Sequence, residues 1–319
     1  MSAVRTSDAA ELAERVLTGD RRAVARLITL IESGAAGPAR TAAERLAPAA
    51  GGAEVVGVTG APGAGKSTLC SRLVGEARRA GRVVGVLAVD PSSPFTGGAL
   101  LGDRVRMQDH TLDRGVFIRS MATRGHLGGL AWATPQAVRV LDAAGCGLVI
   151  VETAGVGQAE VEIAGQADTT VVVLAPGFGD NVQAAKAGIL EIADILVVNK
   201  ADRDGASGLA RDLKEMTALG PGDGWRVPVV RTIAERGEGV AELAATIAAH
   251  REHLIESGAL RRRRADRAGR EITELALARL RAGLPGLDGA GLAELAELAE
   301  RVLAGELGPY TAADELLSG

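Results

Sequence analysis

One stretch decides the fold of this chain: Gly60-Ala61-Pro62-Gly63-Ala64-Gly65-Lys66-Ser67-Thr68. It matches the pattern G-x-x-x-x-G-K-[ST], follows the apolar run Glu54–Thr59 and precedes a segment with helical spacing. Glycines let backbone N–H groups turn inward around phosphate oxygens, and the N-terminus of the following helix adds its positive dipole end. The stretch therefore predicts a phosphate-binding loop, a P-loop, whose residues contact a nucleotide.

Two side chains of this loop carry its chemistry. Lys66 can give a compact positive charge to the β- and γ-phosphates, which makes it a candidate catalytic residue. The hydroxyl of Ser67 is a candidate ligand of Mg²⁺. A plain tight turn is the alternative, but Gly-Lys-Ser-Thr at a strand-to-helix junction is much more specific than glycine spacing alone.

The surrounding pattern predicts the fold class. Near-continuous apolar runs alternate with helical stretches, which indicates an α/β P-loop NTPase with a mostly parallel central sheet covered on both faces. The expected strands are Glu54–Thr59, Val83–Val89, Val116–Arg119, Leu148–Glu152, Thr169–Leu174, Ile195–Val198 and Val227–Arg231. The expected helices lie near 66–80, 134–144, 182–192, 206–217 and 238–255.

Helical segments are expected on both sides of this domain. We predict a helical N-terminal extension over 1–50, the nucleotide-binding domain over 51–256 and a helical C-terminal arm over 257–319. The run Arg261–Arg264 is interpreted as a solvated helix start rather than a nucleic-acid patch, because no aromatic residue is interleaved. Apolar residues in 292–302 form an amphipathic stripe that could pack on the chain's own core or on a second copy.

Composition excludes several classes of protein. A hydrophobic content of 47% in 319 residues is ample for a buried core, and a net charge of −4 argues against a nucleic-acid-binding surface. Charges interrupt every apolar run before the ~20 residues of a membrane span. Cys70 and Cys146 lie too far apart in the sequence for a metal pair or a disulfide framework. We therefore expect a cytoplasmic protein that binds neither nucleic acid nor membrane.

A second motif predicts which base is bound. Asn199-Lys200-Ala201-Asp202 follows the run Ile195–Val198 and has the N-K-x-D pattern of GTP-binding proteins. The carboxylate of Asp202 can accept hydrogen bonds from guanine N1–H and the 2-amino group, a donor pair that adenine lacks on that edge. The stem of Lys200 can lie along the base, and Asn199 can tie neighbouring loops together. GTP and GDP are the expected nucleotides.

The strand after this motif ends at Thr232-Ile233-Ala234, where GTPases usually have Ser-Ala. In those proteins a backbone N–H of the segment reaches guanine O6. Ile233 stands in the place of the serine, so this third element is weaker. The backbone of Ala234 is the expected contact.

Three acidic residues predict a magnesium site. Asp90 and Glu152 end strands, and carboxylates in that position point into the crevice where open α/β sheets bind ligands. Asp103 lies in the stretch between them. We predict that Asp90, Asp103 and Glu152 serve Mg²⁺, directly or through water, and take part in catalysis. An N-cap for Asp90 and a solvated loop charge for Asp103 are the alternatives.

Other candidates are less specific. Gln158 could orient the attacking water, and an arginine could offset charge in the transition state. The pattern does not single out one of Arg104, Arg106 and Arg124. Lys186 fits a solvated helix position best.

These motifs together resemble the MeaB/ArgK GTPases, which are chaperones associated with methylmalonyl-CoA mutase. The resemblance rests on the P-loop, Val89-Asp90-Pro91-Ser92-Ser93, the stretch 96–107, the stretch 152–158 and the N-K-x-D motif. It implies an adenosylcobalamin-dependent acyl-CoA mutase as partner, with GTP hydrolysis gating cofactor loading, protection and reactivation. It also implies a homodimer built through the C-terminal arm and a switch around Asp180–Lys186. Ala154 and Ile233 depart from the family pattern.

Three other functions remain open at this point. A metallochaperone GTPase would need His or Cys clusters, and this chain has only His110, His126, His250 and His253, with no cysteine cluster. An ATP-dependent kinase linked to amino-acid transport conflicts with Asp202. A binding module that holds nucleotide without turnover is the third alternative.

Overall fold

The computed structural model describes residues 6–33, 36–90, 110, 112–122, 133–153, 163–177, 191–218, 224–282 and 291–318. These residues fall into two compact units, Met1–Arg263 and Arg264–Gly319. The N-terminal helices therefore belong to the same unit as the sheet, and the division between the units lies inside the C-terminal helical segment.

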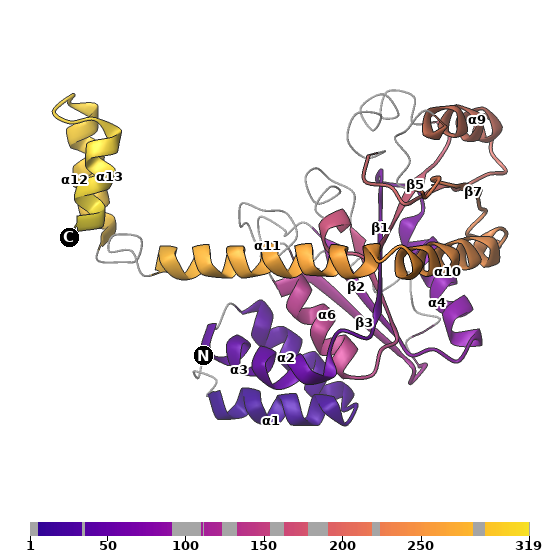
Figure 1. The fold of residues 1–319 in the computed structure, drawn as a ribbon, viewed down its shortest axis with the longest axis horizontal. Helices are drawn as coiled ribbons and strands as arrows, with labels where there is room; N and C mark the ends of the chain where they lie inside the picture. Colours follow the sequence, from indigo (N-terminus) through magenta and orange to yellow (C-terminus); the bar gives the residue numbers. More distant parts are fainter. Residues whose placement is uncertain are drawn as a thin grey trace. The chain divides into compact units, whose positions relative to one another are not determined.

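A seven-stranded parallel sheet forms the centre of the first unit (Figure 1). The strand order is β3-β2-β4-β1-β5-β6-β7. The bounds are β1 Glu54–Gly60, β2 Val84–Asp90, β3 Val116–Ala122, β4 Leu148–Thr153, β5 Thr169–Leu174, β6 Ile195–Val198 and β7 Val229–Arg231. Every expected strand is present, and the α/β P-loop fold is confirmed.

Helices cover both faces of the sheet, as near-continuous apolar strands require. The helices of this unit are α1 Thr6–Leu17, α2 Arg21–Glu32, α3 Ala36–Leu46, α4 Lys66–Arg79, α6 Ala133–Ala143, α9 Ala206–Thr217 and α10 Val240–Glu256. Helices α4 and α10 share one buried cluster with residues such as Val56 and Val58 of β1, while α6 packs with Val149 on the opposite face. The helix expected near 182–192 lies almost wholly outside the described residues.

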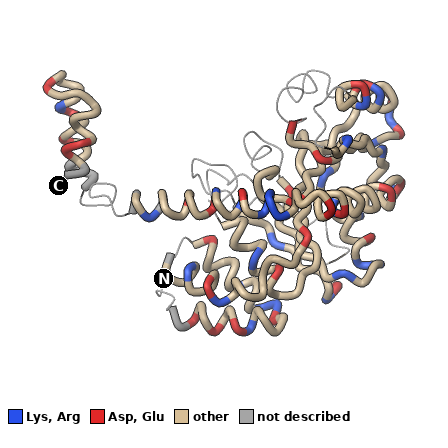
Figure 2. Tube along the Cα trace, in the orientation of Figure 1, with Lys and Arg blue, Asp and Glu red and all other residues tan. Residues whose placement is uncertain are grey.

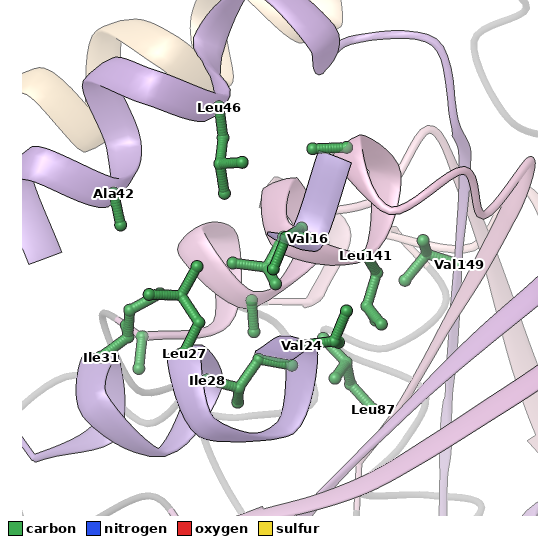
Figure 3. Packing of buried hydrophobic residues seen from close by; sticks show 14 of the residues in the cluster. Val16, Val24, Leu27, Ile28, Ile31, Ala42, Leu46, Leu87, Leu141 and Val149 are labelled. Carbon is green, nitrogen blue, oxygen red and sulfur yellow. The ribbon is translucent and has the colours of Figure 1, made fainter. Parts of the chain in front are cut away.

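The N-terminal helices share their core with the sheet. Figure 3 shows Val16 of α1, Leu27 of α2 and Leu46 of α3 around the same interior as Leu141 of α6 and Leu87 of β2. All five residues are at most 1% exposed. Burial of an aliphatic side chain stabilises a fold by ~1.5–3 kcal/mol. The N-terminal helices are thus part of the layer that covers this face of the sheet.

Three helices make up most of the described part of the C-terminal segment. They are α11 Ala259–Ala282, α12 Gly291–Leu303 and α13 Pro309–Ser318. Figure 2 shows Lys and Arg gathered in the first turns of α11, where the run Arg261–Arg264 lies. Among the described residues of the second unit, Leu298 of α12 is buried. Ile272 and Leu280 of α11 are, in contrast, more than 60% exposed.

Arg263 departs from the expectation of a solvated run. Its guanidinium donates to both carboxylate oxygens of Asp194, at 2.9 and 2.8 Å, and to the carbonyl of Asp168 at 3.0 Å. Its two N-terminal neighbours in the run, Arg261 and Arg262, are exposed as predicted. Helix periodicity accounts for the difference, because successive positions of a helix point in different directions and Arg263 points toward Asp194.

A buried polar cluster surrounds Asp194. The carboxylate also accepts the N–H of Thr170 at 2.8 Å and lies 3.4 Å from Nε2 of the fully buried His250. Burial acts to raise the pKa of Asp194, but hydrogen bonds from His250 and Arg263 outweigh it and lower that pKa below 3.8. His250 is therefore a core histidine with partners, since Nδ1 also lies 2.9 Å from Thr169 Oγ1.

Candidate nucleotide site

The P-loop joins the C-terminal end of β1 to the N-terminus of α4. Gly60 has φ of 133°, and a Cβ there would lie 2.0 Å from the carbonyl oxygen of Val173. Gly65 has φ of 94°, and a Cβ there would lie 2.3 Å from Nδ2 of Asn199. Only glycine fits both positions, because each combines a left-handed backbone with no room for a side chain. The strand-to-helix context that the motif requires is thus present.

Lys66 bends back over its own loop. The ammonium group donates to the carbonyl oxygens of Gly60 at 2.7 Å and Ala61 at 3.1 Å, and the residue is only 6% exposed. The positive end of the α4 dipole lies at the same place, because the helix begins at Lys66. A buried cation beside a helix N-terminus makes the loop suitable for binding an anion such as a phosphate.

Ser67, in the first turn of α4, and Glu152, near the end of β4, come together. Ser67 Oγ donates to Glu152 Oε1 at 2.6 Å, and both residues are buried. Glu152 reaches this position because it pairs with Val58 of β1 near the C-terminal end of β4. Hydroxyl and carboxylate oxygens are the ligand types that Mg²⁺ prefers, so the pair fits such an ion chemically.

The other predicted magnesium ligands are not tested by the structure. Asp90 is the last residue of β2, and its neighbour Val89 pairs with Thr153 at the same edge of the sheet. The side chain of Asp90 and the whole of Asp103 lie outside the described residues. Within the described residues no group of three or more His, Cys, Asp or Glu side chains could hold a metal ion. Gln158, Arg104, Arg106, Arg124 and Lys186 also lie outside them.

Asn199 ties three segments together. Its Nδ2 donates to the carbonyl of Ala64 in the P-loop at 2.8 Å. Its Oδ1 accepts from Thr232 Oγ1 and from the backbone N–H of Ala234, both at 3.0 Å. The side chain is 98% buried, so its hydrogen bonds are shielded from water. Asn199 therefore joins the P-loop to the segment after β7, as the sequence predicted.

Lys200 makes a second link to the P-loop. Among the described residues, Lys200 alone has a positive φ without being glycine; its φ is 57°. Its Nζ donates to the carbonyl oxygen of Gly63 at 2.7 Å. Its stem lines a pocket together with Thr68, Asp202 and Ile233. The predicted base-binding residues and the end of the P-loop thus line the same pocket.

Asp202 and Ala234 already have partners in this pocket. Asp202 lies 3.6 Å from the guanidinium of Arg236, in an ion pair whose members are 39% and 62% exposed. Such an exposed pair contributes little to stability, so the carboxylate can exchange it for other donors. The N–H of Ala234, our expected base contact, instead points to Asn199. The contact of Ala234 with a base stays a prediction.

Two residues of the site escaped the sequence analysis. Arg72 of α4 donates from Nε to the carbonyl of Ala234 at 3.1 Å and from Nη2 to the carbonyl of Glu235 at 2.7 Å. Thr232 supplies the hydroxyl that binds Asn199. Arg72 belongs to no motif, although its position on the exposed face of the P-loop helix could have been read from its spacing to Lys66. Thr232 lies in the Thr232-Ile233-Ala234 segment, but its role as a hydrogen-bond donor to Asn199 was not predicted.

A phosphate loop, an Asn-Lys-x-Asp turn and a shared pocket between them define the class of P-loop nucleotide hydrolases that bind guanine. The model of the family described as methylmalonyl-CoA mutase-associated GTPase MeaB matches residues 24–285. The chain therefore belongs to this family of GTPases and is itself a GTPase, whose substrate is a guanine nucleotide.

Individual relatives agree with this assignment. A protein of Pyrococcus abyssi with a provisional GTPase name is 51% identical over 311 residues, covering 96% of this chain and 95% of the relative. The GTPase ArgK of Escherichia coli is 36% identical over 262 residues, covering 79% and 78%. The crystal structure of an LAO/AO transport system kinase superposes with a TM-score of 0.71 at 26% identity, covering 99% and 98%.

Proposed function

We propose that this GTPase regulates an adenosylcobalamin-dependent acyl-CoA mutase, controlling the loading, protection and reactivation of the cobalamin cofactor. The observation that carries the proposal is the match to the mutase-associated family over residues 24–285, which includes both nucleotide motifs. The phosphate loop and the base pocket are directly joined through Asn199 and Lys200. These two contacts hold the phosphate loop and the base pocket together as one nucleotide site.

The proposed roles of the site residues follow from their contacts. Lys66 holds the β- and γ-phosphates, Ser67 holds Mg²⁺, and Glu152 binds that ion directly or through water and helps to activate the attacking water. Asp90 and Asp103 complete the metal site. Bound Mg²⁺ would supply charge stabilisation to the phosphates. Asp202 reads guanine, while residues 60–68, Asn199, Lys200 and Ala234 form the rest of the nucleotide site.

A homodimer formed through α11 is part of the proposal. Ile272 and Leu280 are 68% and 67% exposed on this helix, and an apolar surface of that kind is typical of an interface. An Ile272→Asp variant is expected to sediment as a monomer where the wild type sediments as a dimer. Thr273→Asp adds the same charge at a neighbouring exposed position and serves as control. Equal sedimentation coefficients for the wild type and both variants would contradict the proposal that α11 forms the dimer interface.

A cytoplasmic location completes the proposal. Within the described residues, no helix combines the length and the apolar character needed to cross a bilayer. The proposed mutase partner uses a soluble acyl-CoA substrate. Fractionation of cells that express the protein from its own promoter would test the location.

One alternative has an observation in its favour. The solved structure that superposes at 26% identity is titled a transport system kinase, which suggests phosphoryl transfer from ATP. Asp202 lines the base pocket, however, and a carboxylate there suits guanine rather than adenine. A kinase would transfer labelled γ-phosphate to a protein or amino acid, whereas a regulatory GTPase would release it as free phosphate.

The experiment that tests the mutase proposal measures cofactor delivery. A purified acyl-CoA mutase from the same source is mixed with adenosylcobalamin and this protein, with GTP, GDP or a non-hydrolysable GTP analogue. We expect cobalamin uptake, followed by its absorbance change, to depend on which nucleotide is present. Lys66→Ala should abolish the nucleotide effect, while Lys214→Ala, on the exposed face of α9, should leave it intact. Identical uptake with every nucleotide would contradict the proposal.

A further inference from the structure

The segment after β7 is held by Arg72, which lies on another element. Arg72 is an exposed residue of α4, the helix that starts at the P-loop. Its guanidinium spans two successive carbonyls, Ala234 through Nε at 3.1 Å and Glu235 through Nη2 at 2.7 Å. A planar guanidinium that donates to two acceptors fixes their orientation more strictly than a single ammonium would.

The hydrogen bond from Arg72 to the carbonyl of Ala234 determines where the backbone N–H of Glu235 points. The carbonyl of Ala234 and the N–H of Glu235 belong to one planar trans peptide, so they point in opposite directions. Arg72 draws this carbonyl toward α4, and a hydrogen bond from Gly237 N at 3.2 Å adds to the restraint. The N–H of Glu235 is therefore turned away from α4.

This N–H is the available donor of the segment. The N–H of Ile233 donates to Glu238 O at 3.0 Å, and the N–H of Ala234 donates to Asn199 Oδ1 at 3.0 Å. Among the described residues, the N–H of Glu235 has no hydrogen-bond acceptor, and Glu235 lines the pocket with Asp202. A donor in such a pocket needs an acceptor from water or from a ligand.

We infer that the backbone N–H of Glu235 binds guanine O6 and that Arg72 is the positioning residue that aims it. Asp202 would take the N1–H and 2-amino edge, so the two residues would together read adjacent positions of the base. The inference rests on the proposed guanine site.

The test compares nucleotides that differ at the base. Dissociation constants are measured by calorimetry for GDP, for inosine diphosphate, which keeps O6 and N1–H but lacks the 2-amino group, and for 2-aminopurine riboside diphosphate, which lacks both O6 and N1–H. The missing N1–H weakens contact with Asp202 in the wild type and in the Arg72 variants alike, so the effect of Arg72 is read from the ratio of the variant and wild-type constants for each nucleotide. Arg72→Ala is expected to raise the dissociation constants of GDP and of inosine diphosphate about fivefold each, as loss of one well-placed hydrogen bond does. The same substitution should leave binding of the 2-aminopurine nucleotide unchanged. Arg72→Lys should recover part of the loss.

Matched controls separate this role from a structural one. Arg79→Ala removes another exposed arginine of α4, one that pairs with Glu76, and should change none of the three constants. In an ¹⁵N-labelled sample, the amide proton of Glu235 should move downfield with GDP and not with the 2-aminopurine nucleotide. Equal weakening of all three nucleotides by Arg72→Ala, or no weakening of any, would overturn the inference. Failure of the wild type to prefer GDP over ADP would instead overturn the guanine site itself.

Discussion

Ser67 Oγ donates a 2.6 Å hydrogen bond to Glu152 Oε1, so the P-loop helix and the end of β4 meet at one buried pair of oxygens. The pair joins the residue expected to hold magnesium to the residue expected to act on the attacking water. Any movement of β4 relative to the P-loop would alter this contact. We therefore expect this contact to respond to the state of the bound phosphates.

Glu152→Gln tests the charge at this pair. The amide keeps the size of the side chain and an acceptor for Ser67, but it removes the negative charge. We expect GTP turnover to fall about 10²-fold, the usual effect of losing a catalytic acid–base group. GDP affinity should change little. Steady-state phosphate release measures the effect, and Glu242→Gln on the exposed face of α10 is the control.

Asp202→Asn should change which base is bound. The carboxylate accepts two donors from guanine, and an amide can accept only through its oxygen while donating through its nitrogen. Xanthine presents an N1–H and a 2-oxo group, which match the amide. We expect GTP affinity to fall about 10²-fold and xanthosine triphosphate affinity to rise. Asp204→Asn, two residues along the exposed loop, should leave both affinities unchanged.

Gly65→Ala should disconnect the two halves of the site. Its Cβ would lie 2.3 Å from Asn199 Nδ2, and the backbone φ of 94° already disfavours a side chain. We expect nucleotide binding to be lost and the free energy of unfolding to fall by more than ~1 kcal/mol. Gly81→Ala is the matched control, because Gly81 has φ of 75° but no atom within 4 Å of the added Cβ. Equal losses in both variants would show that backbone strain, and not the clash, is responsible.

The cluster around Asp194 predicts a pH dependence of stability. Because the fold lowers the pKa of Asp194 below its ordinary value, its stabilising contribution is complete well above that ordinary value and is lost as the pH falls through the lowered value. Asp194→Asn should cost about 1–3 kcal/mol near neutral pH, since Arg263 loses a charged partner. The difference from wild type should narrow between pH 5 and pH ~2 in thermal unfolding. Asp212→Asn, exposed on α9, should show no such difference.

The sequence predicts the sheet well because its strands are buried on both faces. Runs such as Thr169–Leu174 and Ile195–Val198 appear in the structure with unchanged bounds, since no partly exposed position blurs their ends. The last strand begins two residues later than expected, at Val229, where burial is incomplete. Local apolar pattern is thus sufficient where both faces are covered.

The long-range contacts could not be predicted in the same way. Local pattern does not show that Arg72 reaches Ala234 and Glu235 or that Arg263 pairs with Asp194, because more than 60 residues separate the partners in each case. The P-loop and N-K-x-D residues were predictable because their chemistry is local to short motifs. The use of the Ala234 N–H by Asn199 was not, since it depends on how two loops meet.

The most direct measurement of the central claim is phosphate release from GTP and from ATP with Mg²⁺, with and without an acyl-CoA mutase from the same source. We predict turnover that is selective for GTP and that changes when the mutase is added. Labelled phosphate should appear as free phosphate in every case. Turnover of ATP as fast as GTP, or GTP turnover that is indifferent to every mutase tried, would contradict the account.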